Sequence, residues 1–324
     1  MDLRYVVTTG CNADCFFCLN EYIGSKSRQY ITSPQDYGNL SRTAVKLGSE
    51  GVTITGGEPT LREDLEQIIS NIKGAGSNVT VVSNGYKLKR HMNAWGNVDK
   101  LHVSYHTFDE AEWERITKFK GGPSLVAENL IAVRKDHPYL AIRLNVVSTE
   151  ENSNGESLKK YLDLAQKVGA NISVFQNGYL KLLKEIGRLP IGSESPIDFW
   201  DLKSMGGILV QDTPRIKTYG FGDVQIHLTY LSSEMHNGGS IWITPMNEGF
   251  SDIRKRSRLV NFNPSLQARN FDKIEKSLIS LSKEAELLKV MEQKGIKPED
   301  STEYNCLVQE REETLDTTEN KYFF

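Results

Sequence analysis

Three cysteines near the start of the chain, Cys11, Cys15 and Cys18, follow one another with the spacing CxxxCxxC. Thiolates at this spacing can bind three irons of a [4Fe–4S] cluster, whereas a cluster that only transfers electrons normally has a fourth cysteine ligand. The fourth iron is then open to a small molecule that chelates it. The spacing therefore predicts a cluster that takes part in chemistry beyond electron transfer.

A zinc site is the alternative interpretation of the three cysteines. Zinc ribbons use paired CxxC knuckles with four ligands in total, and the only other cysteine of this sequence is the distant Cys306. The tetrapeptide Gly56–Pro59, Gly-Gly-Glu-Pro, follows an apolar run about one βα unit after the cysteines. A protein that only binds metal has no use for this turn, so its presence favours the cluster.

Composition and charge are those of an ordinary globular protein. The 324 residues are 38% apolar and 25% charged, with a net charge of −3, so we expect neither a nucleic-acid duplex nor a membrane as partner. No apolar stretch approaches the roughly 18 to 20 residues of a membrane span, and no cleavable signal layout precedes the first strand. Free thiols and a low-potential cluster need a reducing interior, which predicts a cytoplasmic protein without structural disulfides.

The elements that must position these residues alternate along the first half of the chain. Short apolar runs bounded by Gly, Asn or Ser predict strands at Leu3–Thr8, Val52–Thr55, Val79–Ser83, Leu101–Ser104, Ile142–Val147 and Ile172–Phe175. Between them, Ser33 and Pro34 predict a helix N-cap and first turn. Helical apolar spacing recurs at Leu65, Ile68, Ile69 and Ile72, and at Leu158, Tyr161, Leu162 and Ala165.

This alternation predicts an α/β fold with parallel strands joined by right-handed crossovers. A doubly wound open sheet is the structural alternative to a barrel. The cysteines, Gly56–Pro59, Ser83–Gly85 and Ser104–His106 all follow the carboxyl ends of predicted strands, which form the active face of a βα barrel. We therefore expect a partial (β/α)6 barrel over residues 1–180.

The alternation fades after residue 175. Residues 181–270 mix short apolar runs with Gly, Pro and Asn-rich turns, which predicts an irregular α+β region that closes the barrel mouth and selects the substrate. Residues 271–294 have the pattern of one amphipathic helix, within a last segment, 271–324. From about residue 308 this segment is acidic and polar, and we expect it to be mobile unless the aromatic residues 322–324 dock.

These motifs, in this order, resemble the radical S-adenosylmethionine (SAM) enzymes. In that family the open iron binds the amino and carboxylate groups of SAM, and an electron from the cluster cleaves SAM to a 5′-deoxyadenosyl radical. Within the family the sequence most resembles the molybdenum-cofactor GTP 3′,8-cyclase group. The resemblance covers a little over half of the chain and rests on Leu3–Cys11, Thr55–Leu65, Ser83–Tyr86, Val103–Thr107 and Ile142–Val147.

The resemblance implies a role for each matching residue. Cys11, Cys15 and Cys18 would bind the cluster, Phe17 would lie beside the adenine, and Ser104 would reach the SAM carboxylate or ribose. The other implied SAM-binding positions are Gly56, Gly57, Glu58, Pro59, Ser83, Asn84 and Gln176. Gly56 and Gly57 would receive the methionine amino group through their backbone, so we expect Gly57→Val to weaken SAM binding and to preserve the cluster.

Two arginines, Arg4 and Arg143, stand at positions that in the family face the substrate. Arginine binds phosphate or carboxylate through two hydrogen bonds, which would suit an anionic or polyhydroxylated small molecule. Each position also has a simpler interpretation. Phe17 fits a core residue, Ser104 fits a helix cap, and salt bridges to Asp or Glu would explain both arginines.

The sequence departs from the cyclase pattern in its second half. The cyclase holds a second cluster there with three further cysteines and ends in Gly-Gly, whereas this sequence has only Cys306 in that half and ends in Phe324. Thr53 also stands where the cyclase carries an arginine for the nucleotide. We therefore expect neither a second cluster with three protein thiolates nor GTP cyclisation.

Two residues are candidates for chemistry after the radical has formed. Cys306 could return a hydrogen atom to the substrate, although a lone cysteine is more often a small hydrophobe. His106 stands where the family usually has an aspartate, and a neutral imidazole there could act as acid, base or hydrogen-bond donor. His227 alternates with apolar neighbours and fits a core histidine.

We therefore expect a radical SAM enzyme that binds one [4Fe–4S] cluster and SAM and acts on a small polar metabolite in a biosynthetic pathway. A nucleotide, nucleoside or sugar is the expected substrate, and an external donor such as flavodoxin or ferredoxin would supply the electron. One alternative keeps the chemistry and changes the substrate to a ribosomally made peptide. The other is a non-catalytic iron–sulfur sensor or scaffold. The sequence determines neither the reaction subtype nor the oligomeric state.

Overall fold

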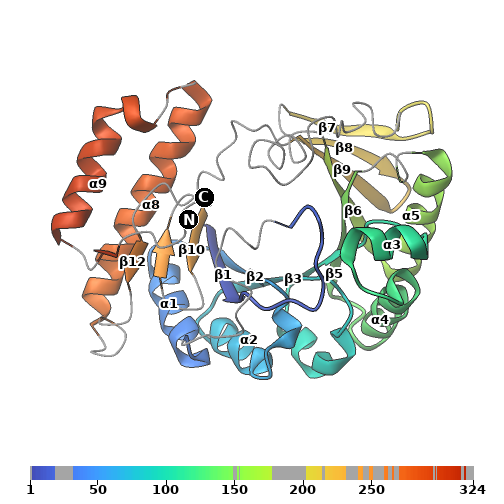
Figure 1. Cartoon of the computed structure of the whole chain (residues 1–324), viewed down its shortest axis with the longest axis horizontal. Coiled ribbons are helices and arrows are strands. Elements are labelled where there is room, and N and C mark those ends of the chain that lie inside the picture. Colours follow the sequence, from blue (N-terminus) through green and yellow to red (C-terminus); the bar gives the residue numbers. More distant parts are fainter. Residues whose placement is uncertain are drawn as a thin grey trace. The chain divides into compact units, whose positions relative to one another are not determined.

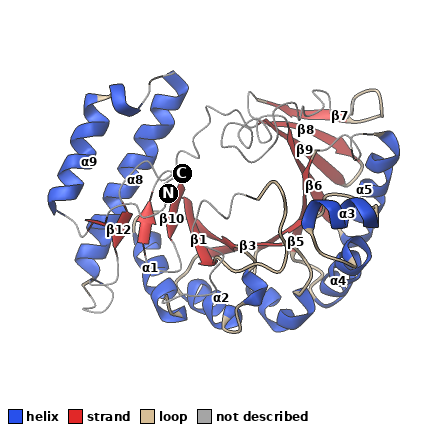
Figure 2. Cartoon of the chain, in the orientation of Figure 1, coloured by secondary structure: helices blue, strands red, loops and turns tan. Residues whose placement is uncertain are grey.

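The structure is a computed structural model, shown in Figures 1 and 2. It describes residues 2–18, 32–148, 152, 154–176, 202–213, 216–230, 240–243, 248–250, 259–261, 265, 270–294, 296, 298–314 and 317–318. Its contacts group the chain into two compact units. Unit 1 contains residues 1–11, 19–81 and 234–324, and unit 2 contains residues 12–18 and 82–233. The boundaries near residues 180 and 270 that composition suggests remain predictions.

Unit 1 is built on parallel strands. β1 (Asp2–Thr8) pairs with β2 (Gly51–Gly56), and β2 pairs with β3 (Asn78–Ser83), which leads into unit 2. On its other edge β1 pairs in parallel with β10 (Ser240–Ile243). The short strands β11 (Glu248–Phe250), β12 (Leu259–Asn261) and β13 (Thr317–Thr318) then follow in antiparallel order. The second half of the chain therefore extends the first parallel sheet.

Helices α1 (Pro34–Lys46) and α2 (Leu65–Gly74) cover one face of β1 and β2 (Figure 1). The predicted cap is confirmed, because the Ser33 hydroxyl accepts the Asp36 N–H at 3.2 Å and the Asp36 carboxylate accepts the Ser33 N–H at 2.9 Å. This reciprocal pair is a capping box, which satisfies amide groups that the first helical turn leaves free. The apolar stripe predicted for α2 is fully buried.

Unit 2 continues the same alternation. β4 (Lys100–Ser104), β5 (Ala141–Val147) and β6 (Ala170–Gln176) run in parallel. β9 (Val224–Tyr230) joins β6 in parallel, β8 (Ile216–Phe221) pairs antiparallel with β9, and β7 (Ile208–Asp212) pairs antiparallel with β8. The connecting elements are η3 (Leu88–Asn97), α3 (Glu110–Thr117), α4 (Gly122–Asp136) and α5 (Gly155–Val168). Of the apolar stripe predicted for α5, Leu158, Tyr161 and Ala165 are buried, whereas Leu162 is not. Leu164 is buried instead.

The predicted α/β class is confirmed, and each of the predicted strands is present within one or two residues of its bounds. In unit 1 the described crossover helices α1 and α2 lie on one face of the strands, and in unit 2 α4 and α5 do so (Figure 2). A doubly wound sheet would have helices on both faces. In each unit the helices therefore lie on one face only, as in part of a βα barrel, with the polar loops at the carboxyl ends of the strands.

The C-terminal helix is confirmed at its predicted bounds, as α8 (Phe271–Lys294). The segment after it differs from the expectation of a mobile tail, because η4 (Pro298–Asp300) leads into a further helix, α9 (Thr302–Thr314). Tyr304 of α9 packs against Leu288 and Met291 of α8, with Leu287 and Val308 beside them. Residues 322–324 lie outside the described residues. No described helix is long and apolar enough to span a membrane.

Candidate functional site

The Gly-Gly turn after β2 packs against the backbone that leads into Cys11. The Gly57 N–H donates to the Thr8 carbonyl at 2.7 Å, and the Glu58 N–H donates to the Gly10 carbonyl at 2.9 Å. A Cβ atom at Gly57 would lie 2.1 Å from the Gly10 oxygen, and one at Gly56, where φ is +140°, would lie 2.3 Å from the Thr8 oxygen. The two glycines therefore allow the turn to lie close to the backbone of residues 8–10, which precedes the first cysteine.

Glu58 holds the turn in place from inside the protein. Its side chain is fully buried, and Oε1 accepts both the Thr60 N–H at 3.0 Å and the Thr60 hydroxyl at 2.7 Å. It thereby caps the short helix η2 (Pro59–Leu61), whose first residue is the proline of the tetrapeptide. These contacts give Glu58 and Pro59 a role in shaping the turn, and a direct contact of either residue with SAM stays a prediction.

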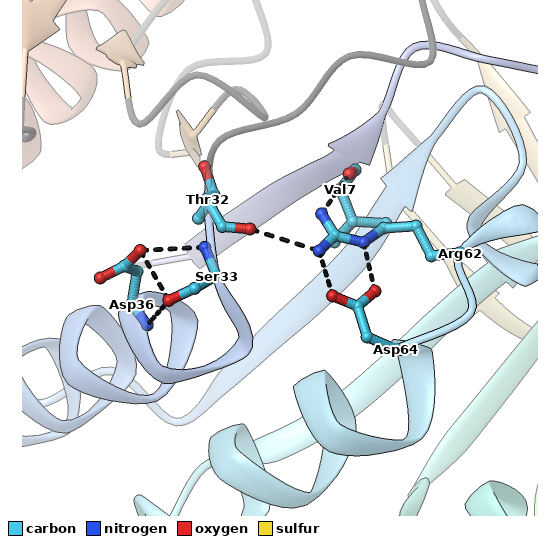
Figure 3. Close-up of polar contacts among 6 residues, drawn as sticks. All are labelled: Val7, Thr32, Ser33, Asp36, Arg62 and Asp64. Carbon is cyan, nitrogen blue, oxygen red and sulfur yellow. Dashed lines mark hydrogen bonds and ion pairs between the residues drawn. The ribbon is translucent and has the colours of Figure 1, made fainter.

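Arg62 contacts two stretches of backbone in unit 1, at Val7 and at Thr32 (Figure 3). Its guanidinium is buried and donates to the Val7 carbonyl at 2.9 Å, to the Thr32 carbonyl at 3.3 Å, and to both oxygens of Asp64 at 2.6 and 2.7 Å. Val7 precedes Cys11 on β1, and Thr32 is the first described residue after Cys18. One side chain of unit 1 therefore holds together two stretches of backbone that precede and follow the cysteines in the sequence.

We expect Arg62→Met to lower the free energy of unfolding by about 3 kcal/mol, because it leaves a partly buried carboxylate and two buried carbonyls without their donor. Iron content after reconstitution should fall as well, and Arg62→Lys should recover part of both losses. Thermal unfolding and iron analysis measure the two effects. The control is Arg42→Met on the exposed face of α1. An equal effect of both substitutions would contradict the role given to Arg62.

In unit 2 the segment with Cys15 and Cys18 docks on the end of helix α3. The Asp14 N–H donates to the Thr117 carbonyl at 2.8 Å, the Phe16 N–H donates to the Ile116 carbonyl at 3.2 Å, and the Cys18 N–H donates to the Cys15 carbonyl at 3.0 Å. The last carbonyls of a helix have no partner within the helix. The cysteine segment supplies that partner and is held in one conformation by it.

Phe17, between two of the cysteines, contacts His106 at the end of β4. The rings meet edge to face with centroids 4.8 Å apart, and both side chains are buried. His106 Nδ1 accepts the Val147 N–H at 3.3 Å, and the Asn152 amide donates to the His106 carbonyl at 2.7 Å. The contacts described for Phe17 are those of a core residue, so its place beside an adenine stays a prediction.

Burial lowers the pKa of His106 to about 4, so its imidazole is neutral at pH 7. This pKa lies below the ordinary value of about 6.5, so the unfolded chain takes up the proton first as the pH falls. Stability from the neutral imidazole is therefore complete above about pH 6.5 and is lost toward pH 4, by about 3 kcal/mol in total. A neutral imidazole can donate or accept a hydrogen bond, but it is a weak base.

We therefore expect the stability of the wild-type protein to fall more steeply between pH 7 and pH 5 than that of His106→Leu. The measurement is anaerobic thermal unfolding of both proteins across this range. Parallel curves for the two proteins would show that His106 is not the group that titrates.

The Ser83–Gly85 turn positions a residue that sequence analysis missed. Ser83 Oγ accepts the Gly85 N–H at 3.0 Å, and Asn84 Nδ2 donates to Asn12 Oδ1 at 2.8 Å. Asn12 Nδ2 is buried and has no hydrogen-bond partner within the described part of the chain. Buried amides without a partner are rare. This donor comes directly after Cys11, and only its position in the sequence next to a predicted ligand could have identified it.

The residues present fit a [4Fe–4S] cluster. All three cysteines are partly exposed, and hydrogen bonds to the sulfurs are a usual feature of cluster sites, for which the Asn12 amide is available. Within the described residues, no three His, Cys, Asp or Glu side chains gather around the position of a single metal ion. A cube does not require this, because each thiolate binds a different iron.

The other predicted site residues lie in different parts of the fold. Arg4 is on β1 in unit 1, whereas Ser104 and Arg143 are half-buried on β4 and β5 in unit 2. Gln176 is the last residue of β6. Cys306 is exposed on α9, which packs against α8 on the side away from β10 and β1 (Figure 1). No contact described for Cys306 brings it to the other candidate residues.

Comparison with known proteins identifies the family. A family model for the radical SAM superfamily matches residues 5–160. A protein of Pyrobaculum aerophilum named "Probable GTP 3′,8-cyclase" is 32% identical over 232 residues, which cover 64% of this chain and 74% of that protein. The chain belongs to the radical SAM superfamily. Its membership implies the cofactors expected from the cysteines, a [4Fe–4S] cluster and SAM.

Two further comparisons limit what can be transferred to this radical SAM protein. A "Probable GTP 3′,8-cyclase" of Metallosphaera sedula is 31% identical over 211 residues, which cover 60% of this chain but only 65% of that protein. The crystal structure of Streptococcus suis SuiB bound to S-adenosylmethionine has a TM-score of 0.52 at 15% identity, over 76% of this chain and 59% of SuiB. At that identity the likeness concerns the fold alone.

Proposed function

We propose that this chain is a radical SAM enzyme that takes a hydrogen atom from a small polar metabolite. The observation that carries the proposal is that the three cysteines of CxxxCxxC occur together with a Gly-Gly turn that packs against the residues before Cys11. The Gly-Gly-Glu-Pro turn lies within the segment that matches the superfamily. A protein that only stores or senses iron would have no use for a turn fitted so closely beside a cluster ligand.

When bound, the cluster and SAM would supply the chemistry, a one-electron reductive cleavage of SAM that allows a hydrogen atom to be taken from the substrate. In this proposal Cys11, Cys15 and Cys18 hold the cluster, Asn12 offers a hydrogen bond to its sulfurs, and Gly56–Pro59 and Ser104 orient SAM. A flavodoxin or ferredoxin is the kind of external donor we propose.

The names of the relatives support a nucleotide or a related polar metabolite as substrate, because both are called probable GTP 3′,8-cyclases. Cys306 is the only cysteine of this sequence outside CxxxCxxC, so these residues cannot supply three thiolates to a second cluster. We therefore propose a reaction other than GTP cyclisation on a substrate of similar polarity.

A peptide substrate is the second candidate. The crystal structure of SuiB bound to the precursor peptide SuiA matches the fold with a TM-score of 0.51 at 15% identity, and no residue of this chain favours a peptide over a metabolite. A non-catalytic iron–sulfur protein is the third candidate. It would bind the cluster and leave SAM uncleaved.

The test is anaerobic reconstitution with iron and sulfide, followed by SAM and dithionite and by chromatography for 5′-deoxyadenosine. We expect slow formation of 5′-deoxyadenosine, faster formation with the correct metabolite, and none with Cys15→Ala. Metabolite fractions and peptides are then screened for acceleration, which separates the first two candidates. A full cluster that yields no 5′-deoxyadenosine with any fraction would favour the non-catalytic protein.

A further inference from the structure

Unit 2 contains two basic stretches that follow neighbouring strands. Residues 84–98, after β3, contain three cationic side chains and no carboxylate, and so do residues 115–127, which begin in α3 after β4. The chain as a whole has a net charge of −3, so this positive charge is a local feature. The six cationic side chains are Lys87, Lys89, Arg90, Arg115, Lys118 and Lys120.

An aromatic contact joins the two stretches. The Tyr86 ring packs against the Phe119 ring with centroids 3.9 Å apart, and the Tyr86 hydroxyl lies 3.4 Å from Thr117 Oγ1. Tyr86 comes immediately before Lys87, and Phe119 lies between two of the lysines. The cationic side chains of both stretches therefore stand around one aromatic contact and form a single surface, which we call the basic patch.

The basic patch keeps most of its charge. All six cationic side chains are exposed. Arg115 has Glu112 at 3.9 Å, and Lys120 has Glu114 at 3.8 Å. Both contacts are long, and ion pairs of this kind at a surface contribute little. Within the described part of the chain, no ion pair is found for Lys87, Lys89 and Lys118.

The basic patch borders the cysteine segment. The last turn of α3 accepts two main-chain hydrogen bonds from that segment, and Arg115 of the same helix lies over the Phe16 ring, with its guanidinium carbon 6.0 Å from the centroid. In the other stretch, the Asn84 amide donates to Asn12 Oδ1 at 2.8 Å. Each basic stretch thus contacts the segment that carries two of the cluster ligands. All of these contacts lie within unit 2.

Exposed lysines on two stretches suit a large partner better than a small anion. A small ligand is bound in a concave site by a few converging polar groups, whereas a charged surface attracts a protein of opposite charge and orients it before contact. A protein that delivers electrons must dock near the cluster, because electron transfer slows steeply with distance. Interfaces between redox partners are also small and weak, which suits a patch of long, exposed side chains.

We propose that the basic patch is the docking surface of a small acidic electron-transfer protein that reduces the cluster. The inference rests on the proposed function for the need of an external donor, and it adds the surface to which that donor binds. With a flavodoxin as donor, the anionic flavin hydroquinone loses one electron and becomes the neutral semiquinone, and the cluster gains that electron. No proton is transferred and no covalent bond forms or breaks.

The test is stopped-flow reduction of the anaerobically reconstituted protein, without SAM, by the hydroquinone of an acidic flavodoxin. At low ionic strength we expect the double variant Lys87→Glu, Lys118→Glu to lower the second-order rate constant by about tenfold or more, because it turns attraction into repulsion. The wild-type rate should fall as salt is added, and at about 0.5 M NaCl the two proteins should differ by about twofold or less.

The matched control is the double variant Lys159→Glu, Lys160→Glu on the exposed side of α5, which changes the net charge by the same amount. It should keep the wild-type rate within about twofold. Dithionite is a small reductant that needs no docking surface, so it should reduce all three proteins equally, and their iron contents should be equal. Equal flavodoxin rates in wild type and the patch variant, or an equal loss in both variants, would overturn the proposal.

A second arm uses only the wild-type protein and so does not depend on the variants folding. A carbodiimide joins lysine amines to carboxylates of bound flavodoxin, and mass spectrometry should find Lys87 or Lys118 among the joined lysines. Links that occur only outside the basic patch would overturn the proposal. Binding of a DNA oligonucleotide that requires both lysines, with flavodoxin reduction independent of them, would assign the patch to a nucleic acid instead.

The two proposals can fail separately. Flavodoxin reduction that depends on the basic patch, in a protein that forms no 5′-deoxyadenosine with dithionite, would keep the docking surface and remove the radical reaction. Formation of 5′-deoxyadenosine with dithionite, together with flavodoxin reduction that does not depend on the patch, would keep the reaction and remove the docking surface.

Discussion

Alanine in place of Cys11, Cys15 or Cys18 should reduce the iron bound after anaerobic reconstitution from about four atoms per chain to nearly none. Each of the three thiolates binds a different iron of the cube, so the loss of one leaves two irons without a protein ligand. Iron and sulfide analysis and the brown absorbance of the cluster measure the effect. Formation of 5′-deoxyadenosine should stop in the same variants.

The matched control is Cys306→Ala, which removes the remaining thiol of the sequence. Cys306 is exposed on α9, so we expect unchanged iron content and an unchanged midpoint of thermal unfolding. Loss of the cluster in Cys306→Ala would mean that the cluster has a fourth protein ligand, and the open iron on which the proposed function depends would no longer exist.

Gly57→Ala should lower the free energy of unfolding by about 3 kcal/mol and should remove most of the cluster. The added methyl group would clash with backbone atoms, whose displacement would disturb the hydrogen bonds around them. A Cβ atom would lie 2.1 Å from the Gly10 oxygen and 2.7 Å from the Thr9 oxygen. Those residues lead directly into Cys11, so relief of the clash must displace the first cluster ligand. The expectation from the sequence, that Gly57→Val preserves the cluster, is therefore replaced by one in which SAM binding and the cluster are lost together.

Gly74→Ala is the control for this prediction. Gly74 ends helix α2 and has no atom within 4 Å of the Cβ position, so alanine there should leave the cluster intact and slightly stabilise the helix. Chemical unfolding and iron content are measured on both variants. A Gly57→Ala protein that holds a full cluster would show that the turn can move without affecting Cys11.

The strands and the first two helices could be predicted because their information is local. A β-branched run between turn residues specifies a strand, as at Val79–Ser83, and a Ser-Pro pair three residues before an acceptor carboxylate specifies a helix start, as at Ser33. The amphipathic repeat of α8 is long enough to mark both of its ends. In these segments the conformational preference of the residues and the pattern of buried side chains favour the same element.

The features that escaped prediction depend on contacts between different elements of the fold. The α9 helix follows a polar sequence and is held by Tyr304 against Met291 of the preceding helix. The parallel pairing of β9 with β6 joins segments some fifty residues apart, by register partners such as Ser173 and His227. The buried Nδ2 of Asn12 can be identified only from the structure, in which Asn84 donates to Asn12 Oδ1 and no described group accepts from Nδ2.

The hydrogen bonds that join the cysteine segment to α3 are made by main-chain groups, the amides of Asp14 and Phe16 and the carbonyls of Thr117 and Ile116. Any residue other than proline can donate from those two positions. The side chains at positions 14 and 16 can therefore vary widely during evolution, provided that the number of residues between Cys11 and Cys18 is kept. An inserted or deleted residue would move both amides out of register with the helix end, so among related chains this segment should differ by substitution and keep its length.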